Sequence, residues 1–328
     1  MTKKVKNIAV LTSGGDAPGM NAAIRAVVRA CSFYKVKCFG VYKGYEGLIH
    51  GEIEELNARS VRNIINRGGT FLKSARSQDF RTEEGRKKAH DNLVKYGIDA
   101  LIVIGGDGSF TGALKLSQEF DFPVVGIPGT IDNDINGTDY TIGYDTALNT
   151  VVEAIDKIRD TASSHNRLFL VEVMGRDAGD IALNAGIGAG AEEILIPEEN
   201  LGIDRLLESL KRSKKSGKTS SIVVVAEGDK SGKNIFELGE YMEEHLEGYE
   251  IRVSVLGHIQ RGGAPSCYDR VLASKLGVGS VEALLEGKRE IMIGIVHKRV
   301  THVPLTTALE KRAHMHDQLI KVADITSV

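Results

Sequence analysis

Two acid-bearing turns hold the residues of this chain best suited to chemistry. Residues 128–134 (PGTIDND) place two carboxylates and a hydroxyl directly after the apolar run 124–127. Upstream, the apolar run 101–104 leads into the turn 105–109 (GGDGS). A simple connecting loop does not need these side chains, and both turns follow strand-like runs. Because ligands bind at the carboxyl ends of strands in open α/β sheets, the two turns predict a ligand site.

The carboxylates of these turns suit phosphoryl transfer. Asp107 lies between Gly106 and Gly108, so it can approach a metal-bound phosphate without obstruction, and Mg²⁺ takes one or two carboxylates with waters and phosphate oxygens. The alternative is an aspartate that only caps a helix starting two residues later. Asp132, with Asp134 beside it, could orient an attacking hydroxyl and accept its proton. An aspartate of pKa about 3.9 cannot deprotonate an alcohol beforehand, so the proton must move as the P–O bond forms.

Glycine turns elsewhere could bind anions. Residues 14–21 (GGDAPGMN) follow the apolar run 8–11 and open a helix, so their N–H groups could face an anion, although a simple strand-to-helix turn fits equally well. The segments 174–176 (MGR) and 258–263 (HIQRGG) each follow a strand-like run with cationic groups beside glycine. That arrangement suits a phosphate. Taken alone, Arg167 and Arg252, at the starts of these two runs, are predicted to be ordinary surface residues.

The elements that must position these turns follow from the apolar pattern. Strand-like runs occur at residues 8–11, 39–42, 101–104, 124–127, 169–173, 222–226, 251–255 and 291–296. Most of them are nearly continuous in Val, Ile and Leu, as strands covered on both faces require. Apolar residues at helical spacing occur within 20–31 and 146–159. The alternation of strand and helix predicts doubly wound parallel sheets.

Length and composition limit the class of protein. A chain of 328 residues exceeds one usual hydrophobic core, so two domains are expected. The formal charge of −2 provides no general field for nucleic acid. Three cysteines without a CxxC pair, no signal peptide and apolar runs far below the roughly 20 residues of a membrane span predict a soluble cytoplasmic protein.

Residues 216–219 (SGKT) are not a P-loop, because they precede a strand and Arg212 stands where that motif has glycine.

Six segments together resemble the bacterial ATP-dependent 6-phosphofructokinase family over nearly the whole chain. They are LTSGGDAPGMNAAIR at 11–25, NRGGTFLKSAR at 66–76, IGGDGS at 104–109, PGTIDNDINGTDYTIGYDTA at 128–147, VEVMGRDAG at 171–179 and VLGHIQRGG at 255–263. The GGDG turn alone also occurs in NAD kinases and diacylglycerol kinases. The resemblance implies ATP-dependent phosphorylation of fructose 6-phosphate at its 1-hydroxyl, the committed step of glycolysis.

It also implies a fold of two Rossmann-like α/β domains with the active site in the cleft between them, assembled as a homotetramer. The domain that binds ATP and Mg²⁺ would comprise residues 1–142 and about 260–306. The domain that binds fructose 6-phosphate would comprise residues 143–259 and about 307–328. The chain would thus return late to its first domain.

The resemblance assigns roles to individual residues. Asp132 is similar to the base, with Thr130 and Asp134 beside it, and Arg76 and Arg176 would stabilise the moving phosphoryl group. Asp107 would be the Mg²⁺-associated acid. The ATP site would comprise Gly15, Arg76, Ser77, Gly106, Asp107, Gly108 and Ser109. The fructose 6-phosphate site would comprise Thr130, Ile131, Asp132, Asp134, Met174, Gly175, Arg176, Glu227, His258 and Arg261, together with Arg167 and Arg252 from an adjacent subunit.

An effector site for ADP or phosphoenolpyruvate is also implied. Its residues would be Arg25, Arg29, Arg159, Gly190, Glu192 and Lys218. Ala58 and Ser216 replace basic residues of well-studied relatives, which leaves the effector and the sign of its action undefined. Lys73 replaces a usual glycine beside the nucleotide turn and has no predicted role.

Two glycines favour ATP as the donor. Pyrophosphate-dependent relatives have aspartate in place of Gly108 and lysine in place of Gly129. Glycine at both positions leaves room for a nucleotide. The alternatives are a pyrophosphate-dependent enzyme, a NAD kinase, and a non-catalytic sensor of sugar phosphate and nucleotide. The TIDND and HIQRGG segments count against a NAD kinase, and the presence of Asp107 and Asp132 counts against a sensor.

Overall fold

The computed structural model describes residues 5–162, 164, 167–199, 202–215, 217, 221–230, 232–312 and 317–327. The chain forms two compact units. Unit 1 comprises Met1–Thr146 and Arg261–Arg312, and unit 2 comprises Ala147–Gln260 and Ala313–Val328. Each unit has its own sheet and is described by itself.

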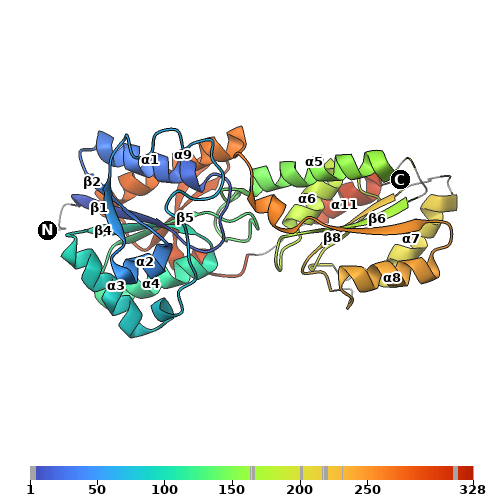
Figure 1. The fold of residues 1–328 in the computed structure, drawn as a ribbon, viewed down its shortest axis with the longest axis horizontal. Helices are drawn as coiled ribbons and strands as arrows, with labels where there is room; N and C mark the ends of the chain where they lie inside the picture. The colour runs from blue at the N-terminus through green and yellow to red at the C-terminus, as the bar shows by residue number, and fades with distance from the viewer. Residues whose placement is uncertain are drawn as a thin grey trace. The chain divides into compact units, whose positions relative to one another are not determined.

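Unit 1 is built on a seven-stranded sheet in the order β11-β10-β5-β4-β1-β2-β3 (Figure 1). Its strands are β1 (Asn7–Thr12), β2 (Lys37–Val41), β3 (Ile53–Leu56), β4 (Ala100–Gly105), β5 (Val124–Pro128), β10 (Ile291–Val296) and β11 (Arg299–Pro304). The strands from β10 to β2 run parallel, while β3 and β11 pair antiparallel at the two edges. The central strands β4 and β5 are buried along their whole length, which explains their unbroken apolar sequence.

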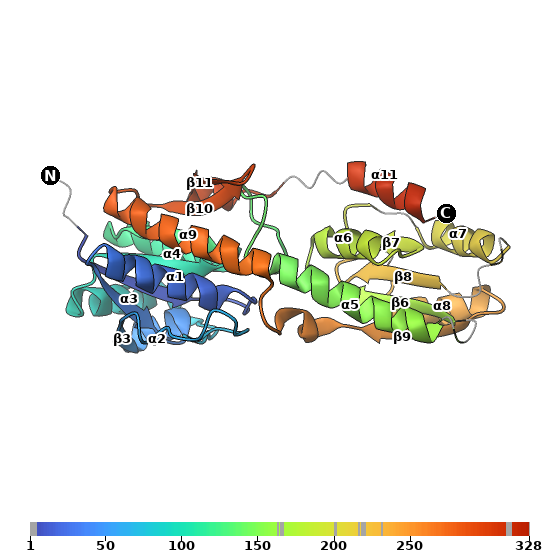
Figure 2. The same cartoon turned by 90° about the horizontal axis from the view of Figure 1, so that it is seen from above.

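Helices cover both faces of this sheet. Helices α1 (Met20–Phe33) and α9 (Cys267–Leu285) lie on one face, and α2 (Gly44–His50), α3 (Glu83–Lys95) and α4 (Asp107–Phe120) lie on the other (Figures 1 and 2). The short elements η1 (Asp79–Arg81) and α10 (Leu305–Ala308) complete the unit. Leu101, Val103 and Phe110 belong to the core cluster on the side of α2, α3 and α4.

A buried aspartate fixes the start of α5 (Tyr144–Ala162), the helix on which the chain passes from unit 1 to unit 2. Asp269 of α9 is fully buried and accepts the N–H groups of Gly143 and Thr146, each at 2.8 Å. Burial raises the pKa of Asp269 to about 6, although these hydrogen bonds act in the opposite direction. The carboxylate thus satisfies two N–H groups at the N-terminus of α5.

Unit 2 is built on a parallel four-stranded sheet in the order β7-β8-β6-β9. Its strands are β6 (Arg167–Val173), β7 (Glu193–Leu195), β8 (Ser221–Ala226) and β9 (Glu250–Val255). Figure 1 shows α5, α6 (Asp180–Gly188) and α11 (Asp317–Thr326) on one face, and α7 (Ile203–Lys215) and α8 (Ile235–His245) on the other. The element η2 (Gly257–Arg261) is a 3₁₀ helix that follows β9.

The structure confirms the predicted α/β class, and each predicted strand and helix is present with slightly longer or shifted bounds. The sequence missed β3, β7 and β11, which all lie at the edges of the sheets. In the described ranges, no helix is long and apolar enough to cross a membrane.

Candidate active site

The three turns predicted to carry chemistry in unit 1 lie at one edge of its sheet. Strand β4 is hydrogen-bonded in parallel to both β1 and β5, so the carboxyl ends of all three strands lie together. The residues that follow β1 and β5 are also hydrogen-bonded to the end of β4. Ser13 N–H donates to the oxygen of Ile104 at 2.9 Å, and Gly129 N–H donates to the oxygen of Gly105 at 3.0 Å. The turns that contain Asp107 and Asp132 are therefore neighbours.

Asp132 is buried, with 3% of its surface exposed. Thr130 Oγ1 donates to its Oδ2 at 3.3 Å and accepts its backbone N–H at 3.2 Å. Thr141 Oγ1 in turn donates to the oxygen of Thr130 at 2.6 Å. This chain of hydrogen bonds fixes the carboxylate before any substrate binds, as a group that must orient a hydroxyl requires.

The rest of the turn is packed tightly. Ile131 is fully buried and Asp134 is half-buried. Asn133 has a φ of 53°, in the left-handed region that asparagine tolerates. Its side-chain oxygen accepts the N–H of Thr141 at 2.9 Å, and Arg312 donates to its backbone oxygen. Hydrogen bonds to both the side chain and the backbone of Asn133 therefore hold the turn in place.

Asp107 is the first residue of α4, and this position bears on the capping alternative. The helix begins at Asp107 rather than near Ser109, and its N-cap residue is Gly106, without a side-chain capping hydrogen bond. Asp107 thus lies in the first turn of α4, where the helix dipole favours a carboxylate. A Cβ on Gly106 would lie 3.8 Å from Thr130 Cβ, which places this glycine beside the turn of Asp132.

The residues around Asp107 suit a magnesium ion that is bound together with a nucleotide. Within the described ranges, no three His, Cys, Asp or Glu side chains form a cluster that could hold a metal. Mg²⁺ bound with a nucleotide needs only one or two carboxylates, since water and phosphate oxygens complete its shell. A half-buried carboxylate beside Gly108, whose Cβ direction meets nothing within 4 Å, fits that arrangement.

The glycine turn after β1 lies against an arginine. A Cβ on Gly15 would meet Arg261 Nη1 at 2.7 Å, and this nitrogen is 3.4 Å from the oxygen of Asp16. Gly14 also adjoins Ser109, because a Cβ on Gly14 would lie 3.5 Å from Ser109 Oγ. Arg261, predicted for the sugar phosphate, thus contacts the predicted nucleotide turn, which α1 follows without a side-chain cap.

The segment of Arg76 also approaches this turn. Ser74 Oγ donates to the oxygen of Gly14 at 2.9 Å, and the backbone oxygen of Lys73 accepts a hydrogen bond from Thr12 Oγ1 at 2.8 Å. Arg76 and Lys73 are exposed, while Ser77 Oγ accepts the N–H of Phe80 at 3.3 Å. The structure therefore brings the segment 73–74 next to the predicted nucleotide turn, and among the described residues no hydrogen bond or ion pair of the Lys73 or Arg76 side chain is seen.

In unit 2, several predicted sugar-phosphate residues meet at the carboxyl end of β6. Glu227 Oε1 accepts the N–H groups of Gly175 at 3.2 Å and of Arg176 at 2.7 Å. Gln260 Oε1 accepts the N–H of Met174 at 2.9 Å. Three consecutive N–H groups of one turn are thus held by side-chain oxygens. His258, two residues before Gln260 in η2, is exposed.

Arg167 and Arg252 lie at the opposite end of this sheet. Arg167 Nε donates to Glu250 Oε2 at 2.8 Å, and Arg252 also pairs with Glu250. Arg167 begins β6, and Arg252 pairs with Phe169 of the same strand, so the two lie about 23 and 17 Å along β6 from Met174, at roughly 3.3 Å per residue. In this chain, both guanidinium groups pair with Glu250 and not with residues of the turn at Met174 that the structure describes.

Part of the predicted effector set is assembled. Arg159 Nη2 donates to the oxygens of Ala189 and Gly190 at 2.7 and 2.6 Å, and Arg159 Nη1 is 3.8 Å from Glu192 Oε1. In unit 1, burial and the nearby charge of Arg29 lower the pKa of Arg25, so these two guanidinium groups share a helix face. Lys218 and Ser216 lie outside the described residues, and so do most residues of the SGKT segment.

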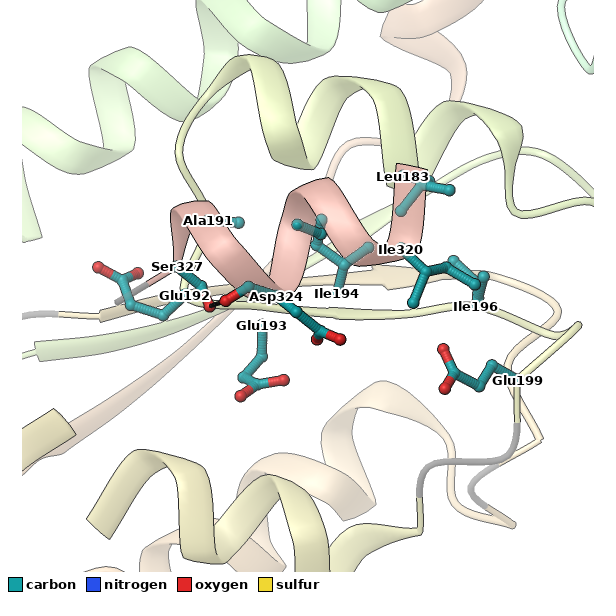
Figure 3. Close-up of a pocket in the computed structure, with 11 residues that line it drawn as sticks. Leu183, Ala191, Glu192, Glu193, Ile194, Ile196, Glu199, Ile320, Asp324 and Ser327 are labelled. Atoms are coloured by element: carbon teal, nitrogen blue, oxygen red, sulfur yellow. Dashed lines mark hydrogen bonds between the residues drawn. The ribbon is translucent and has the colours of Figure 1, made fainter. Parts of the chain in front are cut away.

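A hollow in unit 2 is lined by residues of α6, β7 and α11 (Figure 3). Its apolar lining includes Leu183 and Ile320, and its acidic lining includes Glu193 and Asp324. Glu192 is the one lining residue that was also predicted for a site. None of its lining residues belongs to the predicted catalytic set.

Gln260 is the functional candidate that the sequence missed. It lies inside the HIQRGG segment between His258 and Arg261, so the segment itself was the available signal. Nothing local showed that the amide would turn toward β6, because Met174 is 86 residues away in the chain.

Glycine turns and carboxylates at the carboxyl ends of parallel strands define an α/β enzyme of the phosphotransferase class. The family model described as Phosphofructokinase matches residues 7–284. The chain belongs to the phosphofructokinase family. It is 52% identical to the ATP-dependent 6-phosphofructokinase 2 of Bacteroides thetaiotaomicron over 99% of both chains. It is 55% identical to the ATP-dependent 6-phosphofructokinase of Bacillus subtilis over 99% of this chain and all of that protein.

Solved structures agree with this assignment. The phosphofructokinase of Saccharomyces cerevisiae matches with a TM-score of 0.89 and 37% identity over 93% of this chain, which spans 45% of that yeast chain. A pyrophosphate-dependent phosphofructokinase from Marinobacter aquaeolei matches with a TM-score of 0.84 at 23% identity, over 98% of this chain and 91% of that chain. This second likeness concerns the fold alone.

Proposed function

We propose that this chain transfers the γ-phosphoryl group of ATP to the 1-hydroxyl of fructose 6-phosphate, with Asp132 as the base. The ATP-dependent phosphorylation of fructose 6-phosphate follows from the family and from relatives that carry this name over their full length. The role of Asp132 is the proposal. The observation that carries it is a buried carboxylate, held by Thr130, beside the glycine turn of Asp107.

In this mechanism, Asp132 orients the sugar hydroxyl and accepts its proton as the new P–O bond forms. Thr130 keeps the carboxylate in place, and Asp134 lies in the same turn. Arg76 and Arg176 would spread positive charge over the transferred group and so lower the barrier electrostatically. The predicted domain boundaries and the division of ligands between the domains belong to this proposal as well.

Magnesium is proposed at Asp107. Bound with ATP, the ion would neutralise phosphate charge, and the carboxylate of Asp107 would hold it together with water and phosphate oxygens. The flanking residues Gly106 and Gly108 leave space for this, since a side chain at Gly108 would enter an open region. Chelation with EDTA should therefore abolish turnover, and added Mg²⁺ should restore it.

Two glycines support ATP rather than pyrophosphate as the donor. The position of Gly108 is open, whereas a Cβ on Gly129 would lie 3.0 Å from Ile104 Cγ2 and 3.2 Å from Met20 Cε. A lysine at Gly129, as in pyrophosphate-dependent relatives, would require both neighbours to shift. A coupled assay that compares ATP with pyrophosphate tests this directly, because equal rates with both donors would refute the preference.

We further propose a homotetramer in which Arg167 and Arg252 bind the 6-phosphate in the site of an adjacent subunit. Their position at the far end of β6 and β9 supports a second chain as the source of these contacts. A mixture of Asp132→Asn and Arg252→Ala subunits tests this at low fructose 6-phosphate. Mixed tetramers should regain activity, because some of their sites combine an intact Asp132 with an intact Arg252. Activity that never exceeds the sum of the separate variants would refute shared sites.

Regulation by ADP or phosphoenolpyruvate is proposed for the set of Arg25, Arg29, Arg159, Gly190, Glu192 and Lys218. The supporting observation is that Arg159, Gly190 and Glu192 gather at one place in unit 2. Repeating the donor assay with each compound added measures the effect and its sign. A cytoplasmic location stays a prediction.

A further inference from the structure

Gln260 is a fully buried polar residue whose side-chain oxygen is hydrogen-bonded and whose side-chain nitrogen is not. Its oxygen accepts the N–H of Met174 at 2.9 Å, and this contact fixes the orientation of the amide, because only the oxygen can accept. Within the described part of the chain, its Nε2 has no hydrogen-bond partner. A buried N–H group without a partner costs free energy, so its presence requires an explanation.

Gln260 contacts Met174, which begins the turn that contains Arg176. This turn is left-handed, with φ values of 151° at Gly175 and 54° at Arg176. It is also closely packed, since a Cβ on Gly228 would come within 2.1 Å of the oxygen of Arg176. An arginine in the left-handed region is disfavoured unless the surroundings enforce it. The enforcing groups are the side-chain oxygens of Gln260 and Glu227.

We propose that Gln260 is a positioning residue for phosphoryl transfer, and that its amide oxygen fixes the Met174 N–H and thereby the place of Arg176. The inference rests on the proposed role of Arg176. An apolar side chain of similar size would fill the same space without a buried unpaired N–H group. The amide differs from such a side chain in offering an oxygen that accepts the Met174 N–H. The free-energy cost of the buried, unpaired nitrogen is the consequence of keeping this acceptor.

Two variants distinguish the effect of the hydrogen-bond acceptor of Gln260 from the effect of its side-chain volume. Gln260→Met keeps the length of the side chain and removes both polar atoms. Gln260→Glu keeps an oxygen for the Met174 N–H and replaces the amide nitrogen by a second oxygen, and burial favours the neutral, protonated form of this carboxyl group. We expect Gln260→Met to lower kcat by roughly 10- to 100-fold, the scale of losing a positioned group, while Gln260→Glu stays within about threefold of the wild type. The KM for ATP should change by less than about twofold in both.

Stability distinguishes positioning from a merely structural role. In Gln260→Met, the loss of an acceptor and the removal of the unpaired donor offset each other, so the melting temperature should stay close to that of the wild type. A large fall in melting temperature would make Gln260 a structural residue and overturn the proposal. Unchanged kcat in Gln260→Met, or equal losses in both variants, would also overturn it.

Two further measurements complete the test. Arg176→Ala separates the inference from the function on which it rests. If this change leaves kcat intact, the proposed role of Arg176 fails and the inference fails with it. If Arg176→Ala lowers kcat and Gln260→Met does not, only the inference fails. In the wild type, hydrogen exchange at Met174 should be slow, and a rate near that of an exposed amide would overturn the contact itself.

Discussion

A carboxylate introduced at Gly108 should weaken ATP binding without weakening the fold. Gly108 lies in the first turn of α4, and a Cβ there would meet no atom within 4 Å. An acidic side chain in the first turn is also favoured by the helix dipole, by about 0.3 to 1 kcal/mol. We therefore expect Gly108→Asp to keep or slightly raise the melting temperature.

The magnitude of the binding effect follows from the charge. If the new carboxylate lies about 5 Å from a phosphate of ATP, the repulsion is about 0.8 kcal/mol in bulk water and about 3 kcal/mol at an effective dielectric constant of 20. Because Gly108 is exposed, the true value should fall between these limits. This corresponds to a KM for ATP raised roughly 4- to 140-fold, at about 1.4 kcal/mol per factor of ten.

The assay is steady-state turnover at varied ATP with saturating fructose 6-phosphate. Gly108→Ala is the matched control, since it adds the Cβ and no charge. It should keep a KM near that of the wild type. Equal effects of Ala and Asp would show that shape rather than charge matters, and no effect of either would place the phosphates elsewhere. High salt should reduce the effect of Asp, because exposed charges are screened.

Three more predictions concern the proposed base, the shared site and a buried acid. Asp132→Asn should lower kcat by about 10²- to 10⁴-fold with little change in the KM for ATP, and a loss of only a few-fold would remove it as the base. Arg252→Ala should weaken fructose 6-phosphate binding by about 1.5 to 3 kcal/mol, whereas an unchanged affinity in titrations would contradict the shared site. Asp269 has a folded pKa of about 6, above its value in an unfolded chain, so its contribution to stability falls as pH rises from about 4 to 6. The stability advantage of the wild type over Asp269→Asn should therefore shrink across that range in denaturant titrations, and a constant difference would refute the raised pKa.

Local sequence was sufficient to predict the parts of the fold that are buried on both faces. The runs that became β4 and β5 are apolar at every position, because each is covered by helices on both sides. Their following turns could be placed at one edge because parallel strands share a direction. The strands β3 and β7 escaped prediction because they are short, and β11 because it is mostly exposed, so none of the three has a continuous apolar run.

The sequence by itself determined which chemistry the chain carries, since the residue types and the order of its turns specify phosphoryl transfer. Only the tertiary structure decided which distant groups meet. It placed the guanidinium of Arg261 against Gly15, paired Arg167 with Glu250, and turned the amide of Gln260 toward Met174. The physical reason is that residue type and spacing act locally, whereas these contacts join residues far apart in the chain and exist only once the strands have paired.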